Sequence, residues 1–160
     1  MIPFSRPYLT GKELDYIREA CSAGKLSGDG DFTKKCHSLL SSITGIKNIL
    51  LTTSGTHALD MIAHLLDIRP GDEVIMPSFS FSSTANAFVL RGARAKFVDI
   101  RPDTLNIDET KIEEAITKKT KAVCAVHYAG VICEMDALRS VCDRHKLFLV
   151  EDGAQKVKDY

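Results

Sequence analysis

Short apolar runs alternate with segments of helical periodicity over residues 46–155, and this alternation constrains the fold more than any other feature. The runs that we expect to be strands are residues 48–52, 73–76, 95–100, 122–126 and 147–150. Strands separated by helices of about 10–15 residues indicate right-handed βαβ units. Runs without polar alternation are typical of strands covered on both faces. The sequence therefore predicts an α/β fold of three layers, α/β/α, with a mostly parallel sheet.

Two helices are expected ahead of this sheet region. Thr10 and Glu13 have the spacing of a capping box, which indicates that a helix begins there. A second amphipathic segment follows and stops near Gly45, where glycine is a common helix terminator. We therefore expect residues 1–45 to supply N-terminal helices and residues 46–155 to supply the sheet.

Charge and composition exclude several functional classes. The chain has 21 Lys plus Arg and 21 Asp plus Glu, for a net charge of +0. Nucleic-acid binding and polybasic membrane binding both need a basic excess, so neither partner is expected. No apolar run reaches the roughly 18–20 residues of a membrane span, and the N-terminus does not resemble a secretory signal. The five cysteines form no Cys-x-x-Cys pair and the histidines show no metal-ligand spacing, so we expect a cytoplasmic protein with free thiols and no metal.

Ligands of a parallel sheet bind beyond the carboxyl ends of its strands. Ser54, Gly55 and Thr56 follow the first expected strand and precede a helix. The first amides of a helix lack internal partners and, with the helix dipole, attract anions such as phosphate. The turn is not a P-loop, because no Gly-Lys-Ser/Thr follows. The alternative is that Ser54 and its neighbours only cap the helix.

Two further candidates follow later strands. Phe81 lies among hydroxyl residues, where an aromatic ring can stack on a flat heterocycle; the alternative is loop packing. Asp152 follows the last run, where a carboxylate can keep a pyridine nitrogen protonated; the alternative is a helix cap or a surface acid. His127 and Tyr128 either line the same pocket or pack against their surroundings.

Taken together, these motifs resemble the DegT/DnrJ/EryC1/StrS family of sugar-nucleotide aminotransferases. The phrases that carry the resemblance cover nearly the whole chain and include LLTTSGTHALDM, GDEVIMPSFSFSSTANAFVLRGA, FVDIRPDTLNID, VHYAG and VEDGAQ. The resemblance implies the large domain of the aspartate-aminotransferase-like fold, with pyridoxal 5'-phosphate (PLP) as cofactor. It also implies a homodimer that transfers an amino group from glutamate to a 4-keto-6-deoxy nucleotide sugar. Such sugars serve lipopolysaccharide or enterobacterial common antigen biosynthesis.

The resemblance further implies which residues contact the cofactor. They are Ser54, Gly55 and Thr56 at the phosphate, Phe81 on the ring face, Asp152 at the pyridinium nitrogen and Gln155 near the phenolic oxygen. The family usually reads Glu-Asp-Ala-Ala-Gln at this point, whereas Gly153 replaces the first alanine in this chain. This departure loosens the backbone beside Asp152.

The residue that we expect this chain to lack is the family's Schiff-base lysine. In relatives it lies further along, beyond a strand rich in Ser, Phe and His, and neither Lys156 nor Lys158 matches that motif. We therefore expect residues 1–160 to be an incomplete PLP-binding large domain, without the C-terminal small domain and inactive alone. The alternative is a non-catalytic fragment that binds PLP or a nucleotide sugar, or an interaction module.

Overall fold

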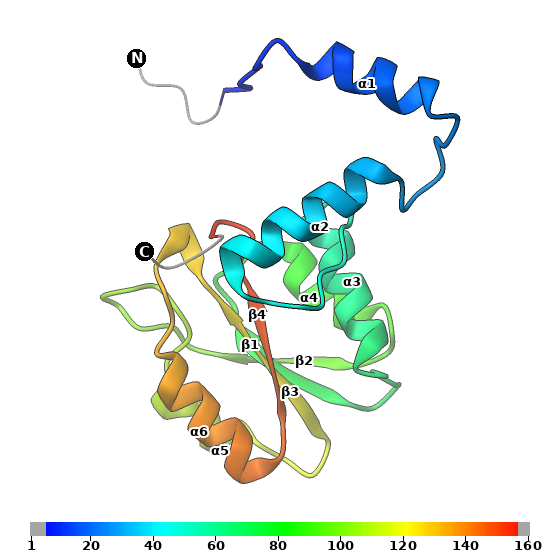
Figure 1. The fold of residues 1–160 in the computed structure, drawn as a ribbon. Helices are drawn as coiled ribbons and strands as arrows, with labels where there is room; N and C mark the ends of the chain where they lie inside the picture. Colours follow the sequence, from blue (N-terminus) through cyan, green and yellow to red (C-terminus); the bar gives the residue numbers. More distant parts are fainter. Residues whose placement is uncertain (1–5, 157–160) are drawn as a thin grey trace. The chain divides into compact units, whose positions relative to one another are not determined.

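The computed structural model of the chain describes residues 6–156. It divides into two compact units, Met1–Leu51 and Thr52–Tyr160. The first unit holds two helices, and the second holds the sheet and the helices that cover it (Figure 1). Within residues 6–156, every helix is too short or too polar to cross a bilayer.

The first unit consists of α1 (Glu13–Ser22) and α2 (Asp31–Thr44). The Glu13 carboxylate accepts hydrogen bonds from the backbone and the hydroxyl of Thr10, at 2.6 and 2.8 Å. Glu13 thus takes the part expected of the acidic member of a capping box. Gly45 ends α2 with φ 75°, a left-handed conformation that glycine adopts without strain.

The second unit is built on a four-stranded sheet in which every pairing is parallel. The strands are β1 (Glu73–Pro77), β2 (Arg94–Val98), β3 (Thr120–Val126) and β4 (Phe148–Asp152), in the order β2-β1-β3-β4. At the carboxyl end of the sheet, Val126 pairs with Asp152. The register therefore brings the end of β4 level with the turn that follows β3.

Helices cover both faces of the sheet. They are α3 (Gly55–Leu65), α4 (Ser82–Val89), η1 (Glu109–Lys111), α5 (Ile112–Ala115), η2 (Tyr128–Gly130) and α6 (Met135–His145). Side chains of α3 and α4 pack on one face, and those of α5 and α6 pack on the other. The predicted three-layer α/β/α fold with a parallel sheet is confirmed.

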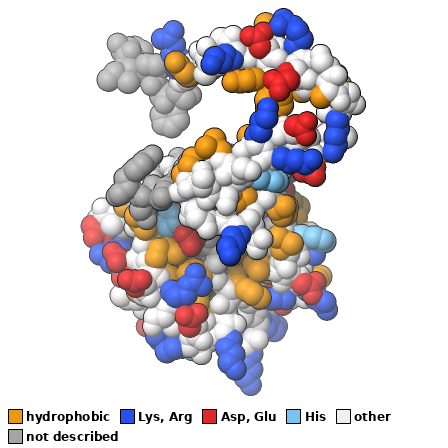
Figure 2. All heavy atoms as spheres, viewed as in Figure 1, with side chains coloured by type: hydrophobic (Ala, Val, Ile, Leu, Met, Phe, Trp, Pro, Cys, Tyr) orange, Lys and Arg blue, Asp and Glu red, His pale blue; other side chains and the backbone are white. Residues whose placement is uncertain are grey.

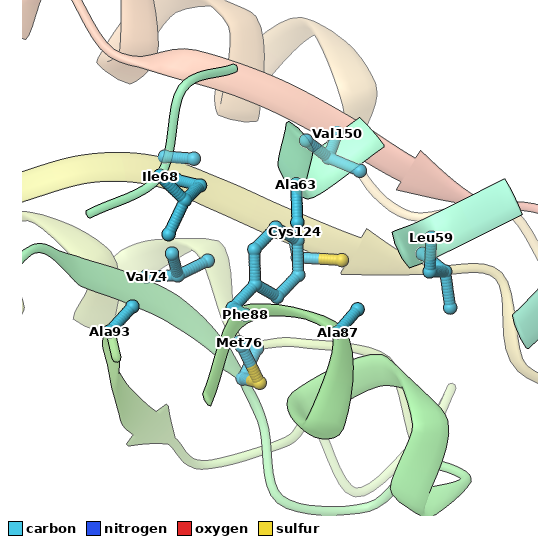
Figure 3. Close-up of a cluster of buried hydrophobic side chains, with 11 residues drawn as sticks. Leu59, Ala63, Ile68, Val74, Met76, Ala87, Phe88, Ala93, Cys124 and Val150 are labelled. Carbon is cyan, nitrogen blue, oxygen red and sulfur yellow. The ribbon is translucent and has the colours of Figure 1, made fainter. Parts of the chain in front are cut away.

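The alternation of side chains along the strands produces two apolar cores. Val74 and Met76 of β1 point into the first core, where they join Phe88 of α4 and Leu59 of α3 (Figure 3). Ile75, which lies between them in the sequence, points into the second core. Phe88 is fully buried, and removing such a side chain from water stabilises the fold by about 1.5–3 kcal/mol.

One predicted strand is wrong. Residues 48–52 form no strand, and Leu50 and Leu51 are exposed at 63% and 44%. A strand is stabilised by backbone hydrogen bonds to a neighbouring strand, and none of the four described strands pairs with this run. Apolar composition alone was therefore insufficient to define a strand at this position.

Charged side chains are spread over the second unit. On the face of that unit in the lower part of Figure 2, lysine and arginine side chains are interspersed with aspartate and glutamate. This mixture agrees with the net charge of +0. No field of one sign, of the kind that attracts nucleic acid, forms on the face that is shown.

Candidate functional site

A cavity of about 380 Å³ lies at the carboxyl ends of the strands in the second unit. Five of the six predicted cofactor residues line it: Gly55, Thr56, Phe81, Asp152 and Gln155. They come from the starts of α3 and α4, the end of β4 and the turn after β4. Phe81, Asp152 and Gln155 come together because each follows or ends a strand at the carboxyl end of the parallel sheet. Gly55 and Thr56 follow no strand, and they reach the cavity as the first residues of α3.

The sixth residue, Ser54, is not part of the lining and instead caps α3. Its backbone is extended, and its Oγ accepts a hydrogen bond from the amide of His57 at 3.2 Å. Among the described residues, no acceptor meets the amides of Gly55 and Thr56, the first two residues of the helix. These two amides, at the positive end of the helix dipole, can bind an anion.

Asp152 is a buried acid and not a surface one. Only 9% of the residue is exposed, whereas the preceding Glu151 points to the other side of the sheet and is exposed. Asp152 Oδ1 accepts from the amide of Ala154 at 3.2 Å, and Oδ2 accepts from the Thr84 hydroxyl at 2.8 Å. Asp152 is the last residue of β4 itself, so the strand positions it at the cavity.

The donor set around Asp152 leaves its charge without a cationic partner. Within residues 6–156 no lysine, arginine or histidine forms an ion pair with this carboxylate. Burying a charge is costly unless it is paired or hydrogen-bonded, and both partners of Asp152 are neutral donors. A cationic group in the cavity would supply the missing partner, and the protonated nitrogen of a pyridine ring fits this requirement.

The two aromatic residues after β1 behave differently. Phe79 packs against Tyr128, with ring centroids 4.4 Å apart and planes at 44°. Phe81 is 73% exposed and lines the cavity, just before α4 begins. The alternative of loop packing describes the neighbouring Phe79 and does not describe Phe81, whose exposed ring is available to a ligand.

Gln155 holds in place the turn that follows β3, and both border the cavity. Its Oε1 accepts from the amide of Ala129, which has φ 53°, and Gly130 follows with φ 81°. The amide group of Gln155 retains its NH₂ as a donor. Gln155 therefore shapes the wall through its oxygen and can serve a ligand through its nitrogen.

His127 lines the cavity as a neutral ring. Its Nδ1 accepts from the amide of Cys133 at 3.2 Å, so the proton must be on Nε2, which donates to Glu151 at 3.2 Å. The side chain is 5% exposed. The sequence left open whether His127 lines the pocket or packs against its surroundings. The ring does both, because it borders the cavity and is buried.

Of three further residues that shape the site, Asn106 was missed in the sequence, whereas Ser80 and Thr84 were among the hydroxyl residues around Phe81 but their partners were not foreseen. Asn106 is 2% exposed, and it accepts from the amide of Tyr128 at 3.1 Å and donates to the carbonyl of Val131 at 2.9 Å. Thr84 binds Asp152, and Ser80 lies 2.7 Å from Thr84. The signal available for Thr84 was its place on the apolar face of α4, three residues before Ala87, where a polar side chain needs a partner.

No lysine lies among the described residues that line the cavity. Lys156 belongs to the turn after β4, where its amide donates to the carbonyl of Gly153 at 2.8 Å. Lys158, which the sequence singled out with it, lies outside the described residues. Nor does any group of three or more His, Cys, Asp or Glu within residues 6–156 offer a metal site.

Comparison with known proteins identifies what this arrangement is similar to. The model of the DegT/DnrJ/EryC1/StrS aminotransferase family matches residues 7–158. GDP-perosamine synthase of Caulobacter vibrioides is 37% identical over 98% of this chain. NtdA of Bacillus subtilis, solved with the bound cofactor PMP (pyridoxamine phosphate), superposes on 89% of the chain with TM-score 0.85 and 38% identity. The aminotransferase TlmJ of Streptoalloteichus hindustanus covers 98% of it with TM-score 0.89 and 36% identity.

The relatives are longer than this chain. The chain spans 40–43% of the curated relatives that it matches. It likewise covers 33% of NtdA and 43% of TlmJ. The predicted fold class is confirmed by these superpositions, and the cofactor expectation is confirmed at the level of the family by the PMP-bound relative.

Proposed function

The chain belongs to the DegT/DnrJ/EryC1/StrS aminotransferase family, and from this premise we propose that its second unit binds PLP in the cavity at the end of the sheet. Gly55 and Thr56 hold the phosphate, Phe81 covers one face of the ring, and Asp152 meets the ring nitrogen. Gln155 donates its NH₂ to the phenolic oxygen. Ser54 does not contact the cofactor. It caps α3 through the amide of His57, and the amides of Gly55 and Thr56 stay free to bind the phosphate.

The observation that carries the proposal is the carboxylate of Asp152, which is buried, lines the cavity and has no cationic partner among the described residues. When bound, PLP supplies an electron sink that stabilises negative charge at a substrate carbon. The part of Asp152 is to keep the ring nitrogen protonated, because an adjacent negative charge favours the charged form of a base.

The phosphate end relies on backbone and not on side-chain charge. Within the part of the chain that the structure describes, no lysine or arginine lines the cavity. The two free amides lie at the first turn of α3, where the helix dipole favours an anion, and Thr56 lines the cavity and carries a hydroxyl. A dianionic phosphate would therefore bind to these donors at one end of the cavity. The Asp152 carboxylate would bind the ring nitrogen.

For the whole protein we propose transfer of an amino group from glutamate to a 4-keto-6-deoxy nucleotide sugar. A relative named GDP-perosamine synthase supports a nucleotide-sugar substrate. Because no lysine of residues 6–156 lines the cavity, the catalytic lysine of the family is proposed to come from outside these residues. A homodimer, a role in surface-polysaccharide biosynthesis and a cytoplasmic location remain predictions.

A second candidate function follows from the same absence of a lysine in the lining. In it, residues 1–160 bind PLP without catalysing transfer, as an incomplete large domain or a binding module. Both candidates share the cofactor site, so binding of PLP is the first property to test.

We predict that the 160-residue chain binds PLP saturably and that Asp152→Asn weakens this binding at least tenfold. The substitution keeps the size of the side chain and removes its charge, so the protonated ring nitrogen loses its partner. Quenching of tyrosine fluorescence by PLP, titrated to saturation, measures the dissociation constant.

The matched control is Asp143→Asn, which removes the same charge from an exposed position on α6. It should bind PLP as tightly as the original chain. Absence of saturable binding, or equal affinity of the Asp152→Asn variant and the original chain, would contradict the proposal.

A further inference from the structure

Thr84 joins helix α4 to the end of the last strand through a buried hydroxyl. Its Oγ1 donates to Asp152 Oδ2 at 2.8 Å, although the two residues are 68 positions apart. Only 1% of Thr84 is exposed. Solvent therefore cannot replace this partner if the hydrogen bond is lost, and the bond is worth more than one at the surface.

The direction of hydrogen bonding beyond Thr84 follows from the chemistry of its partner. An ionised carboxylate accepts and cannot donate, so the single hydroxyl proton of Thr84 is committed to Asp152. Ser80 Oγ lies 2.7 Å from Thr84 Oγ1 and must therefore be the donor of that second bond. The three side chains form a chain of hydrogen bonds in which Ser80 donates to Thr84 and Thr84 donates to Asp152.

The series fixes the carboxylate from two sides. The amide of Ala154 donates to Oδ1 from the turn after β4, at 3.2 Å, and Thr84 donates to Oδ2 from α4. The terminal torsion of an aspartate is otherwise broad, so two donors on separate elements are needed to hold it. Both donors are neutral, so they offset part of the cost of burying the charge without cancelling it.

We infer that Thr84 is a positioning residue, which holds the Asp152 carboxylate in the orientation that meets the ring nitrogen of PLP, and that Ser80 holds Thr84. The inference rests on the proposed function, in which Asp152 is the partner of that nitrogen. Thr84 is not among the residues that line the cavity, whereas Ser80 and Asp152 are. An effect of Thr84 on the cofactor must therefore pass through Asp152 or Ser80, and only the effect through Asp152 depends on the ring nitrogen.

The test uses Thr84→Val, which keeps the shape of the side chain and removes the hydroxyl. A hydrogen bond to a charged group that is lost in a buried site predicts about tenfold weaker PLP binding. Thr84→Ser restores the hydroxyl and should bind PLP nearly as tightly as the original chain. The 1-deaza analogue of PLP has carbon in place of the ring nitrogen, so Thr84→Val should leave its affinity unchanged.

Thr117→Val is the matched control. It also removes a hydrogen bond from a threonine hydroxyl to a carboxylate, here an exposed one from Thr117 to Glu73 Oε2 at 2.6 Å, at the amino end of β1. This variant should bind PLP with unchanged affinity. The inference is overturned if Thr84→Val binds PLP normally, or if it loses affinity equally for PLP and for the deaza analogue.

Thermal unfolding of the cofactor-free chain separates this inference from the proposed function. Thr84→Val should lower the Tm of the original chain but not that of an Asp152→Ala variant, in which the partner of the hydroxyl is already gone. If this coupling is found and the original chain binds no PLP, the proposed function fails and the positioning of Asp152 by Thr84 stands. If Thr84→Val lowers both Tm values equally, Thr84 does not act through Asp152 and the inference fails.

Discussion

The charge of Asp152 influences more of the second unit than the cavity alone. The thiol of Cys124 has its pKa raised, first by its complete burial and then by the negative charge of Asp152. The pKa of the Cys133 thiol is raised to about 11, again chiefly by burial. The thiolate is the reactive form of cysteine, so both side chains are expected to be inert in the folded protein.

Reaction with Ellman's reagent tests this expectation. Cys21 and Cys36 are exposed, whereas the other three cysteines are buried. We predict that two thiols react rapidly at pH 8 and that three react only after unfolding in guanidinium chloride. A third rapidly reacting thiol in the folded chain would show that one of the buried sites is open.

The sequence predicted the site residues whose role depends on where they stand along the chain. It did not predict the roles of residues that depend on a hydrogen-bond partner far away in the sequence. Asp152 follows an apolar run that became β4, so its place at the carboxyl end of the sheet follows from the sequence. Gly55 was predictable as the start of a helix, although the run before it forms no strand. Thr84 and Asn106 gain their roles from partners 68 and 22–25 residues away. Only the packing of distant elements brings such pairs together, and periodicity carries no information about it.

At the level of secondary structure, the sequence defined the elements that have neighbours within the described chain. Four of the expected runs became β1 to β4, and Pro77 ends β1 one residue later than expected. The run at residues 48–52 has the same apolar character and remains outside the sheet. This run differs from β1, β3 and β4 in that it pairs with no strand of the described sheet. Each of those three strands buries apolar side chains beside a neighbouring strand, and this run does not.

The link between α4 and β2 depends on Gly92. Its φ is 86°, and an added Cβ would lie 2.9 Å from the backbone Cα of Pro70. We predict that Gly92→Ala destabilises the chain by about 2–4 kcal/mol, through left-handed strain and overpacking together. Urea unfolding followed by circular dichroism measures the change.

Gly71→Ala is the control that separates the two causes. Gly71 also has a positive φ, 93°, but an added Cβ would meet no atom within 4 Å. The control should show only the cost of strain, about 1 kcal/mol. Equal losses for the two variants would mean that the close approach of Pro70 to Gly92 does not matter for stability.

At the level of the whole molecule, one three-layer unit carries all the proposed cofactor contacts. The phosphate donors lie at the start of α3, the ring-covering Phe81 lies before α4, and the carboxylate ends β4. The proposed catalytic lysine is not among them. We therefore propose that the second unit binds the cofactor. The lysine that carries out the chemistry is proposed to come from another part of the family's fold.

The most direct test of this account is an NMR titration of the ¹⁵N-labelled chain with PLP. We predict that the amides of Gly55 and Thr56 and the side-chain NH₂ of Gln155 shift saturably, because these groups donate to the cofactor. Gly71, at the opposite end of the sheet, should not shift. Unchanged signals from Gly55 and Thr56 at saturating PLP, or shifts confined to residues outside the cavity, would contradict the proposed site.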